Sequence, residues 1–196
     1  MTNDLLERFK RKKAPLKAEE IMEAGYTYKE IGILEANGEI KRFKNGYYTC
    51  PEVDISEEDM VIAMFPDGVF TMETALYYHG YISSRPYHWS VAISKNASKS
   101  RFKLDYPIIH PFYAEPKVLA EGVMKMELPA GEINIYEKDR LICEMMKYED
   151  KMDRDDFKQA LLSYITDKER DISKLLYHAE KRRVLKKTRS IIGVWI

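Results

Sequence analysis

Cysteine is scarce in this sequence: Cys50 and Cys143 are the only two among 196 residues, and neither lies in a C-x-x-C pair or a His-rich segment. Neither a disulfide framework nor a zinc site is therefore indicated. Long apolar runs are missing too, since no stretch approaches the roughly 18 apolar residues of a membrane helix. The start, Met1 to Lys13, is charged and shows no signal peptide. We expect a cytoplasmic protein with no membrane partner.

Motifs that cradle phosphates or carry a nucleophile are also absent. The sequence contains no G-x-x-x-x-G-K-[ST] loop, no G-x-G-x-x-G, and no Gly-Ser followed by the paired acidic residues of a nucleotidyltransferase. The S-x-x-K match at Ser100 to Lys103 lacks its accompanying motifs, and we interpret it as chance.

Histidines and acidic residues do not form a metal-binding pattern either. His79, His88 and His110 are scattered, and His79, which precedes Gly80, is typical of a group at the C-terminal end of a helix. The acidic cluster from Glu149 to Asp156 fails the EF-hand spacing. We therefore expect binding rather than catalysis, with no metal and no cofactor. An enzyme stays open as an alternative, because the second half of the chain is large enough to hold an active site.

Charge is partitioned along the chain, although 32 basic and 32 acidic residues balance overall. Residues 1–50 carry 10 basic and 8 acidic groups, residues 51–167 carry 13 and 21, and residues 168–196 carry 9 and 3. The basic ends and the acidic middle favour one element that faces nucleic acid and another region that faces something else. Solvated helix faces are the plainer alternative.

Three short helices are predicted in the first forty residues. Leu5, Leu6 and Phe9 form one apolar stripe between Asp4 and Lys13, and a second helix runs from about Lys17 to Ala24 with Gly25 at its end. The segment from Thr27 to Glu30 fits a capping box and begins a third helix, which Asn37-Gly38 ends.

A hairpin is predicted immediately afterwards, because two β-prone arms between Glu39 and Thr49 meet at Asn45-Gly46. Helix, helix, tight turn, helix and basic hairpin is the order of a winged helix-turn-helix. In that arrangement the start of the third helix would reach a major groove and the hairpin would follow phosphates. The predicted DNA-binding residues are Thr27, Tyr28, Lys29, Lys41, Arg42, Lys44, Asn45 and Tyr47. A winged helix can also serve as a protein-interaction module, and the lysines would then only prevent the edge strand from pairing with another chain.

The remainder of the chain mixes helices and strands. Helices are predicted from Ser56 to Phe65, Thr71 to Tyr78, Lys138 to Lys147 and Asp153 to Ile165, and strands at Trp89 to Ser94, Tyr106 to Tyr113 and Gly131 to Tyr136. We therefore predict an α+β protein: an N-terminal winged helix-turn-helix at residues 1–52 and a mixed α/β C-terminal domain at residues 53–196.

One last helix is predicted from about Asp171 to Lys187, with a basic second half. Its cations are possible secondary contacts to nucleic acid or to a partner: Lys181, Arg182, Arg183, Lys186 and Lys187. The apolar end, Ile191 to Ile196, is expected to pack onto the body of the protein or onto a partner.

Five features of the sequence occur in a characteristic order: Gly25 ahead of the third helix, Asn45-Gly46-Tyr47-Tyr48 in the wing, the stretch from Phe65 to Gly80, the strand at Trp89 to Ile93, and Ile133 through Leu141. In these features, and over essentially its whole length, the chain resembles the AbiEi-type antitoxins of bacterial abortive-infection (AbiE) toxin–antitoxin systems. Cys143 and Glu144 stand where that family commonly has an aspartate.

The resemblance implies a type IV antitoxin in two parts. Its N-terminal domain would bind operator inverted repeats and repress its own operon, and its C-terminal domain would counter a nucleotidyltransferase-like toxin without a stable complex. It implies no catalytic residues. Two alternatives stay open beside it: a regulator unrelated to toxin–antitoxin systems, and an interaction module whose acidic middle binds a basic partner, including the toxin itself. We expect the protein to act as a monomer or a weak dimer.

Overall fold

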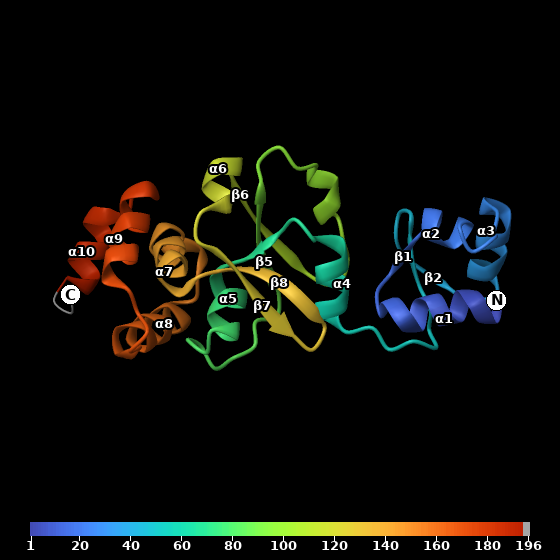
Figure 1. Cartoon of the computed structure of the whole chain (residues 1–196), viewed down its shortest axis with the longest axis horizontal. Helices are drawn as coiled ribbons and strands as arrows, with labels where there is room; N and C mark the ends of the chain where they lie inside the picture. The colour runs from blue at the N-terminus through green and yellow to red at the C-terminus, as the bar shows by residue number, and fades with distance from the viewer. Residues whose placement is uncertain (194–196) are drawn as a thin grey trace. The chain divides into compact units, whose positions relative to one another are not determined.

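The computed structural model describes residues 1–193 and shows an α+β protein of two compact units (Figure 1). The first unit contains Met1–Pro66 together with Pro129–Gly131, and the second contains Asp67–Leu128 and the chain from Glu132 onward. The domain boundary predicted between residues 52 and 53 lies within the first unit, which continues to Pro66. Among the described residues, none of the helices combines the length and the apolarity that a membrane span requires.

The first unit begins with three short helices and a small sheet. Its helices are α1 (Asn3–Lys12), α2 (Ala18–Met22), α3 (Tyr28–Ala36) and α4 (Glu57–Met64). Its strands are β1 (Leu16–Lys17), β2 (Lys41–Lys44) and β3 (Tyr47–Thr49), antiparallel in the order β1-β3-β2. The three predicted helices and the hairpin are confirmed, whereas β1 was not predicted because two residues carry no periodicity.

One apolar core holds these elements together. Leu5 and Phe9 of α1, Ile21 of α2, and Ile31 and Leu34 of α3 are all at most 6% exposed. Burying a side chain of this kind stabilises the fold by about 1.5–3 kcal/mol. The core therefore fixes α3 against the two preceding helices.

The second unit is built on a mixed five-stranded sheet in the order β6-β5-β4-β8-β7. Strand β4 runs antiparallel to β5 and parallel to β8, and β5 runs parallel to β6. The predicted strands at Trp89 to Ser94 and Gly131 to Tyr136 are confirmed. The strands are β4 (Val69–Phe70), β5 (Trp89–Ser94), β6 (Ile109–Ala114), β7 (Val123–Leu128) and β8 (Gly131–Tyr136).

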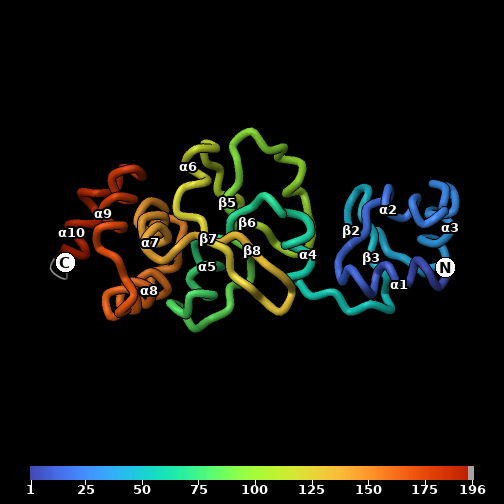
Figure 2. The backbone as a smooth tube through the Cα atoms, in the orientation of Figure 1, coloured from blue at the N-terminus to red at the C-terminus, as the bar shows by residue number. Residues whose placement is uncertain are grey.

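Helices accompany this sheet, and the last four follow one another after β8 (Figure 2). The helix predicted from Ser56 to Phe65 is confirmed as α4, and Ser56 caps it through a box with Asp59. The remaining helices are α5 (Met72–Tyr78), α6 (Pro116–Ala120), α7 (Lys138–Lys147), α8 (Arg154–Thr166), α9 (Ile172–Lys181) and α10 (Leu185–Ile192), with 3₁₀ turns at Lys99–Phe102 and Glu149–Lys151.

The prediction of a single helix from Asp171 to Lys187 is wrong, because the structure has two helices there: α9 ends at Lys181 and α10 begins at Leu185. Arg183 adopts a left-handed conformation with φ of 60°. The amide of Val184 donates to the Ala179 carbonyl at 2.8 Å and that of Arg183 to the Glu180 carbonyl at 3.0 Å. This is a Schellman ending, and the buried Val184 and Ala179 supply its apolar contact. The sequence did not reveal this helix end, because arginine occupies the left-handed position where glycine is usual.

The apolar end of the chain is described only in part. Ile192 is 1% exposed and so is packed against the rest of its unit. Of the segment predicted to pack, Ile191 to Ile196, residues 194–196 lie outside the described residues.

Candidate nucleic-acid interface

A capping box fixes the start of α3. The Glu30 carboxylate accepts hydrogen bonds from the Thr27 amide at 2.8 Å and the Thr27 hydroxyl at 2.7 Å, while the Thr27 oxygen accepts from the Glu30 amide at 3.3 Å. The bonds from the Thr27 backbone and side chain lower the pKa of Glu30. Thr27 is thus occupied by the cap, and its role is to position the first turn.

The first turn of α3 presents Tyr28 and Lys29 to solvent. Tyr28 is 66% exposed, which is unusual for a ring of this size, and Lys29 is exposed as well. Because the cap fixes the backbone beneath them, both side chains leave the helix from a defined base. They can reach a ligand without disturbing the core.

The hairpin carries the remaining predicted contacts, and they differ in their surroundings. Lys41 and Asn45 are exposed, Lys44 and Tyr47 are half-buried, and Gly46 takes the positive φ of 77° that the tight turn needs. The Gly46 carbonyl accepts from the Ala18 amide at 2.9 Å, which ties the turn to the start of α2. The Lys17 ammonium lies 6.0 Å from the centre of the Tyr47 ring.

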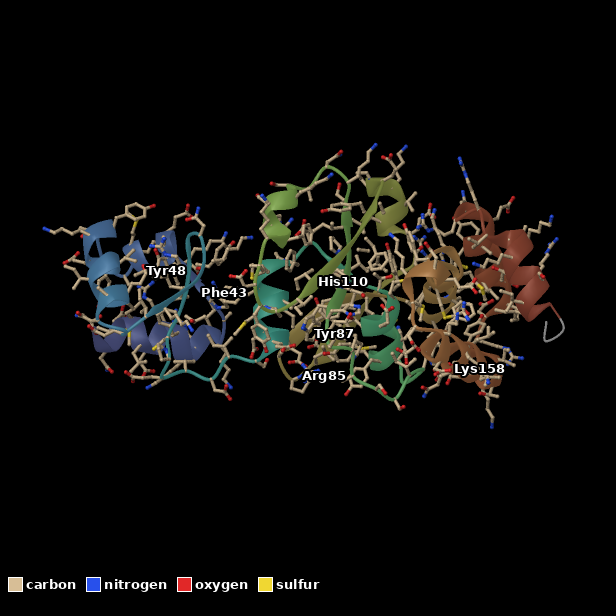
Figure 3. The ribbon with its side chains drawn as sticks, turned by 180° about the vertical axis from the view of Figure 1, so that it is seen from behind. Phe43, Tyr48, Arg85, Tyr87, His110 and Lys158 are labelled. Atoms are coloured by element: carbon tan, nitrogen blue, oxygen red, sulfur yellow. The ribbon has the colours of Figure 1, made fainter. Side chains whose placement is uncertain are left out.

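Arg42 is already engaged within the unit. Its Nη2 donates to Glu35 Oε2 at 2.8 Å, and its guanidinium lies 5.7 Å from the centre of the Tyr48 ring, which Figure 3 labels. The hydrogen bond to Glu35, followed by the charges of Tyr48 and Glu35, raises the pKa of Arg42. The pair joins the last turn of α3 to β2, so any phosphate reaching Arg42 competes with Glu35.

The basic C-terminal residues fall into two classes. Lys181, Arg183 and Lys186 are exposed. Arg182 is 7% exposed and its guanidinium is paired with Glu144, so it is less available than the exposed cations for the contact predicted for it. Lys187 donates to the Met146 carbonyl at 2.6 Å and pairs with Glu149.

A buried polar group that sequence reasoning missed lies in the second unit. Glu73 accepts from the Ser90 hydroxyl at 3.0 Å and lies 3.6 Å from His88 Nε2. The rings of His88 and His110 stack with centres 3.8 Å apart, and the exposed Tyr87 lies beside them (Figure 3). Burial, then the nearby His88, lowers the pKa of His110. Tertiary structure brings these residues together, because Ser90 of β5 and His110 of β6 are paired in register and Glu73 of α5 bonds to Ser90.

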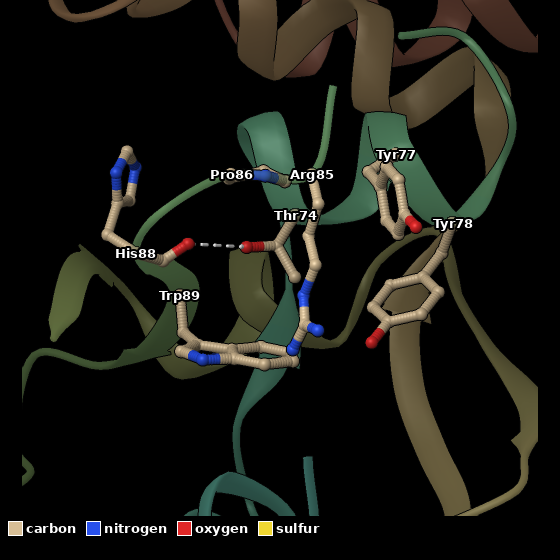
Figure 4. A pocket seen from close by; sticks show the side chains of 7 residues that line it. All are labelled: Thr74, Tyr77, Tyr78, Arg85, Pro86, His88 and Trp89. Carbon is tan, nitrogen blue, oxygen red and sulfur yellow. Dashed lines mark hydrogen bonds between the residues drawn. The ribbon is translucent and has the colours of Figure 1, made fainter. Parts of the chain in front are cut away.

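A narrow pocket lies beside this group and is lined by Thr74, Tyr77, Tyr78, Arg85, Pro86, His88 and Trp89 (Figure 4). In Figure 4 the His88 ring points away from the pocket, while the Arg85 guanidinium lies 5.7 Å from the centre of the Trp89 ring. The interior volume is about 10 Å³. That is room for a single water.

His79 behaves as predicted. It is the C-terminal cap of α5, and its Nε2 lies 2.8 Å from the Tyr136 carbonyl oxygen. Burial lowers its pKa. Within residues 1–193, no three His, Cys, Asp or Glu side chains are grouped so as to hold a metal ion.

No protein-family model matches the chain, and no curated protein matches it.

Proposed function

We propose that the chain is a DNA-binding antitoxin and autorepressor, acting in the cytoplasm. Its N-terminal unit binds operator inverted repeats as a winged helix-turn-helix, and its C-terminal unit counters a nucleotidyltransferase-like toxin without forming a stable complex with it. The proposal assigns binding, not catalysis, and a monomer or weak dimer.

One observation carries the DNA-binding part. A capped helix presents Tyr28 and Lys29 to solvent, and the same unit carries a hairpin with Lys41, Arg42 and Lys44. A short helix start with exposed polar side chains suits a major groove, and cations on an adjacent hairpin suit phosphates. The antitoxin part is supported by the sequence resemblance.

The test uses the full chain and a duplex from the region upstream of its own gene, with a scrambled duplex as reference. The variant replaces Lys41, Arg42 and Lys44 by glutamine. Binding should weaken on both duplexes, and the slope of log K against log salt should fall by about 0.9 for each phosphate that the variant no longer neutralises.

A matched control replaces three cations of α1 and its end: Lys10→Gln, Arg11→Gln and Lys13→Asn, the asparagine because Lys13 has a positive φ of 47°. The control removes the same charge and should retain most of the affinity. Equal effects of the two variants, or no operator preference at low salt, would reject the hairpin as the contact.

The antitoxin part needs its own measurement. Co-expression of the chain with a nucleotidyltransferase-like toxin encoded beside it should restore growth, and the hairpin variant should restore growth as well as the wild type. Continued growth arrest with the wild-type chain would reject this part and leave the DNA-binding part intact.

An interaction module is the second candidate, and the Arg42–Glu35 pair favours it. A cation satisfied by its own unit is less available to phosphates than a free one. On this alternative, neither duplex binds selectively and the hairpin substitutions leave the salt dependence unchanged.

A further inference from the structure

A hollow of about 690 Å³ opens beside the C-terminal end of α7 and the turn between α9 and α10. Five of its lining residues are cations: Lys147, Arg182, Arg183, Lys186 and Lys187. Among the described residues that line it, none is acidic. The volume lies within the range of roughly 300–1,000 Å³ that is usual for small-molecule sites.

The five cations are not equivalent. Arg182 is neutralised by the buried Glu144, and Lys187 by Glu149. Within residues 1–193, Lys147, Arg183 and Lys186 form no ion pair. The hollow therefore holds an excess of positive charge that the rest of its unit does not balance.

The fold holds the three unpaired cations in electrostatically unfavourable positions. Burial and then the nearby Arg182 lower the pKa of Lys147, which is the direction expected where like charges are crowded. Lys186 lies in the first turn of α10, which contains no acidic residue, and the helix dipole disfavours a cation there. The Schellman ending fixes Arg183 in its left-handed conformation next to them. An anion in the hollow would offset the repulsion between Lys147 and Arg182 and the unfavourable position of Lys186 in the helix dipole.

The remaining lining indicates what the anion is attached to. Ile191 supplies apolar surface, the mostly buried Val184 and the fully buried Met146 lie behind it, and the exposed Ser190 supplies a hydroxyl. Arginine and lysine together suit the oxygens of a phosphate, and an apolar wall suits the face of a base.

We propose that this hollow binds the phosphate of a nucleotide, free or within a nucleic-acid strand, with Lys147, Arg183 and Lys186 as its cationic ligands. A site of this kind is separate from the operator contacts proposed for the first unit. It gives the second unit a ligand of its own.

The experiment uses the full chain with ¹³C-methyl methionine, and follows the Met146 signal by NMR during titration with AMP and with a ten-nucleotide single-stranded RNA. Met60 of α4 is the internal reference. We expect the Met146 signal to shift and the Met60 signal to stay in place. A shift with AMP identifies a free nucleotide as sufficient, and a shift with the RNA alone identifies a strand; either result supports the proposal.

The test variant is Arg183→Asn with Lys186→Gln, since asparagine tolerates the left-handed conformation at 183. Affinity should fall at least tenfold. The control, Lys158→Gln with Lys168→Gln, removes equal charge from α8 and the loop after it, and should stay within twofold. If the double variant loses its cooperative thermal transition, Lys147→Gln replaces it.

Three results would overturn the proposal. The first is a Met146 signal that does not shift with either probe at millimolar concentration, and the second is an equal loss of affinity in the control variant and the test variant. The third is a shift produced only by a polyglutamate peptide, which would indicate an acidic protein segment instead. The hairpin variant with glutamine at 41, 42 and 44 must leave the Met146 titration unchanged. The nucleotide site and operator binding can thus fail independently.

Discussion

Arg182 of the α9 ending and Glu144 of α7 form a buried ion pair across 38 residues of sequence, with Nη2 donating to Oε2 at 2.8 Å. The same carboxylate accepts from Arg140 Nε at 2.8 Å. All three residues are at most 7% exposed. Burial would lower the pKa of Arg182, but the hydrogen bond and charge of Glu144 outweigh it and raise that pKa. One carboxylate therefore serves two buried guanidinium groups.

Glu144→Gln should destabilise the protein strongly. It leaves the buried Arg140 and Arg182 without their counter-charge, and breaking such a pair costs about 3–5 kcal/mol. Urea unfolding followed by circular dichroism measures the loss. Glu180→Gln, on the exposed part of α9, should change the free energy of unfolding by less than about 0.5 kcal/mol. Similar values for the two variants would mean that the buried pair is not a stability determinant.

Asp167 should make stability depend on acid pH. Its carboxylate accepts from the Tyr81 hydroxyl at 2.6 Å and lies 2.9 Å from the Lys138 ammonium. Burial opposes ionisation, but these two bonds outweigh it and lower the pKa of Asp167 to about 2.

Because the folded-state pKa lies below the unfolded value of about 3.9, the contribution of Asp167 is fully present above about pH 5 and is lost as pH falls toward 2. It amounts to at most about 2 kcal/mol. Asp167→Asn should therefore flatten the fall in melting temperature between pH 5 and pH 2, whereas Asp105→Asn in an exposed loop should not. Parallel profiles for wild type and Asp167→Asn would contradict the assignment.

Glu35→Gln should strengthen DNA binding if Arg42 contacts phosphate. The substitution removes the carboxylate that competes for the Arg42 guanidinium, so the cation becomes available. A gain of about threefold to tenfold is expected in titrations of the upstream duplex. Glu23→Gln removes one negative charge from an exposed position beside α2 and corrects for the general effect of charge. An equal gain from both variants would place Arg42 outside the interface.

Tyr28→Ala and Lys29→Ala should change sequence preference as well as affinity. If either side chain contacts a base, the loss against the preferred base is about 1–3 kcal/mol and is smaller on duplexes altered at that position. Competition among single-base variants of the upstream duplex measures this. Uniform weakening on every duplex would instead indicate a phosphate contact.

Local signals accounted for much of the fold. The capping boxes at Thr27 and Ser56, and the Asn45-Gly46 turn, were readable because each depends on residues within a few positions of one another. Strand β1 and the end of α9 could not be predicted from the sequence. Strand β1 is defined only by its pairing with β3, and the end of α9 has Arg183 at the position where glycine is usual.

Sequence by itself thus determined the α+β class, the helix starts, the hairpin and the positions of the cations on α3 and β2, since these follow from local geometry and periodicity. Tertiary structure alone decided which charges are available. It turned Arg182 inward onto Glu144, engaged Arg42 with Glu35, and gathered Lys147, Arg183 and Lys186 around one hollow. The physical reason is that a charge is satisfied or left open by neighbours that are distant in sequence, and only packing of the core brings those neighbours together.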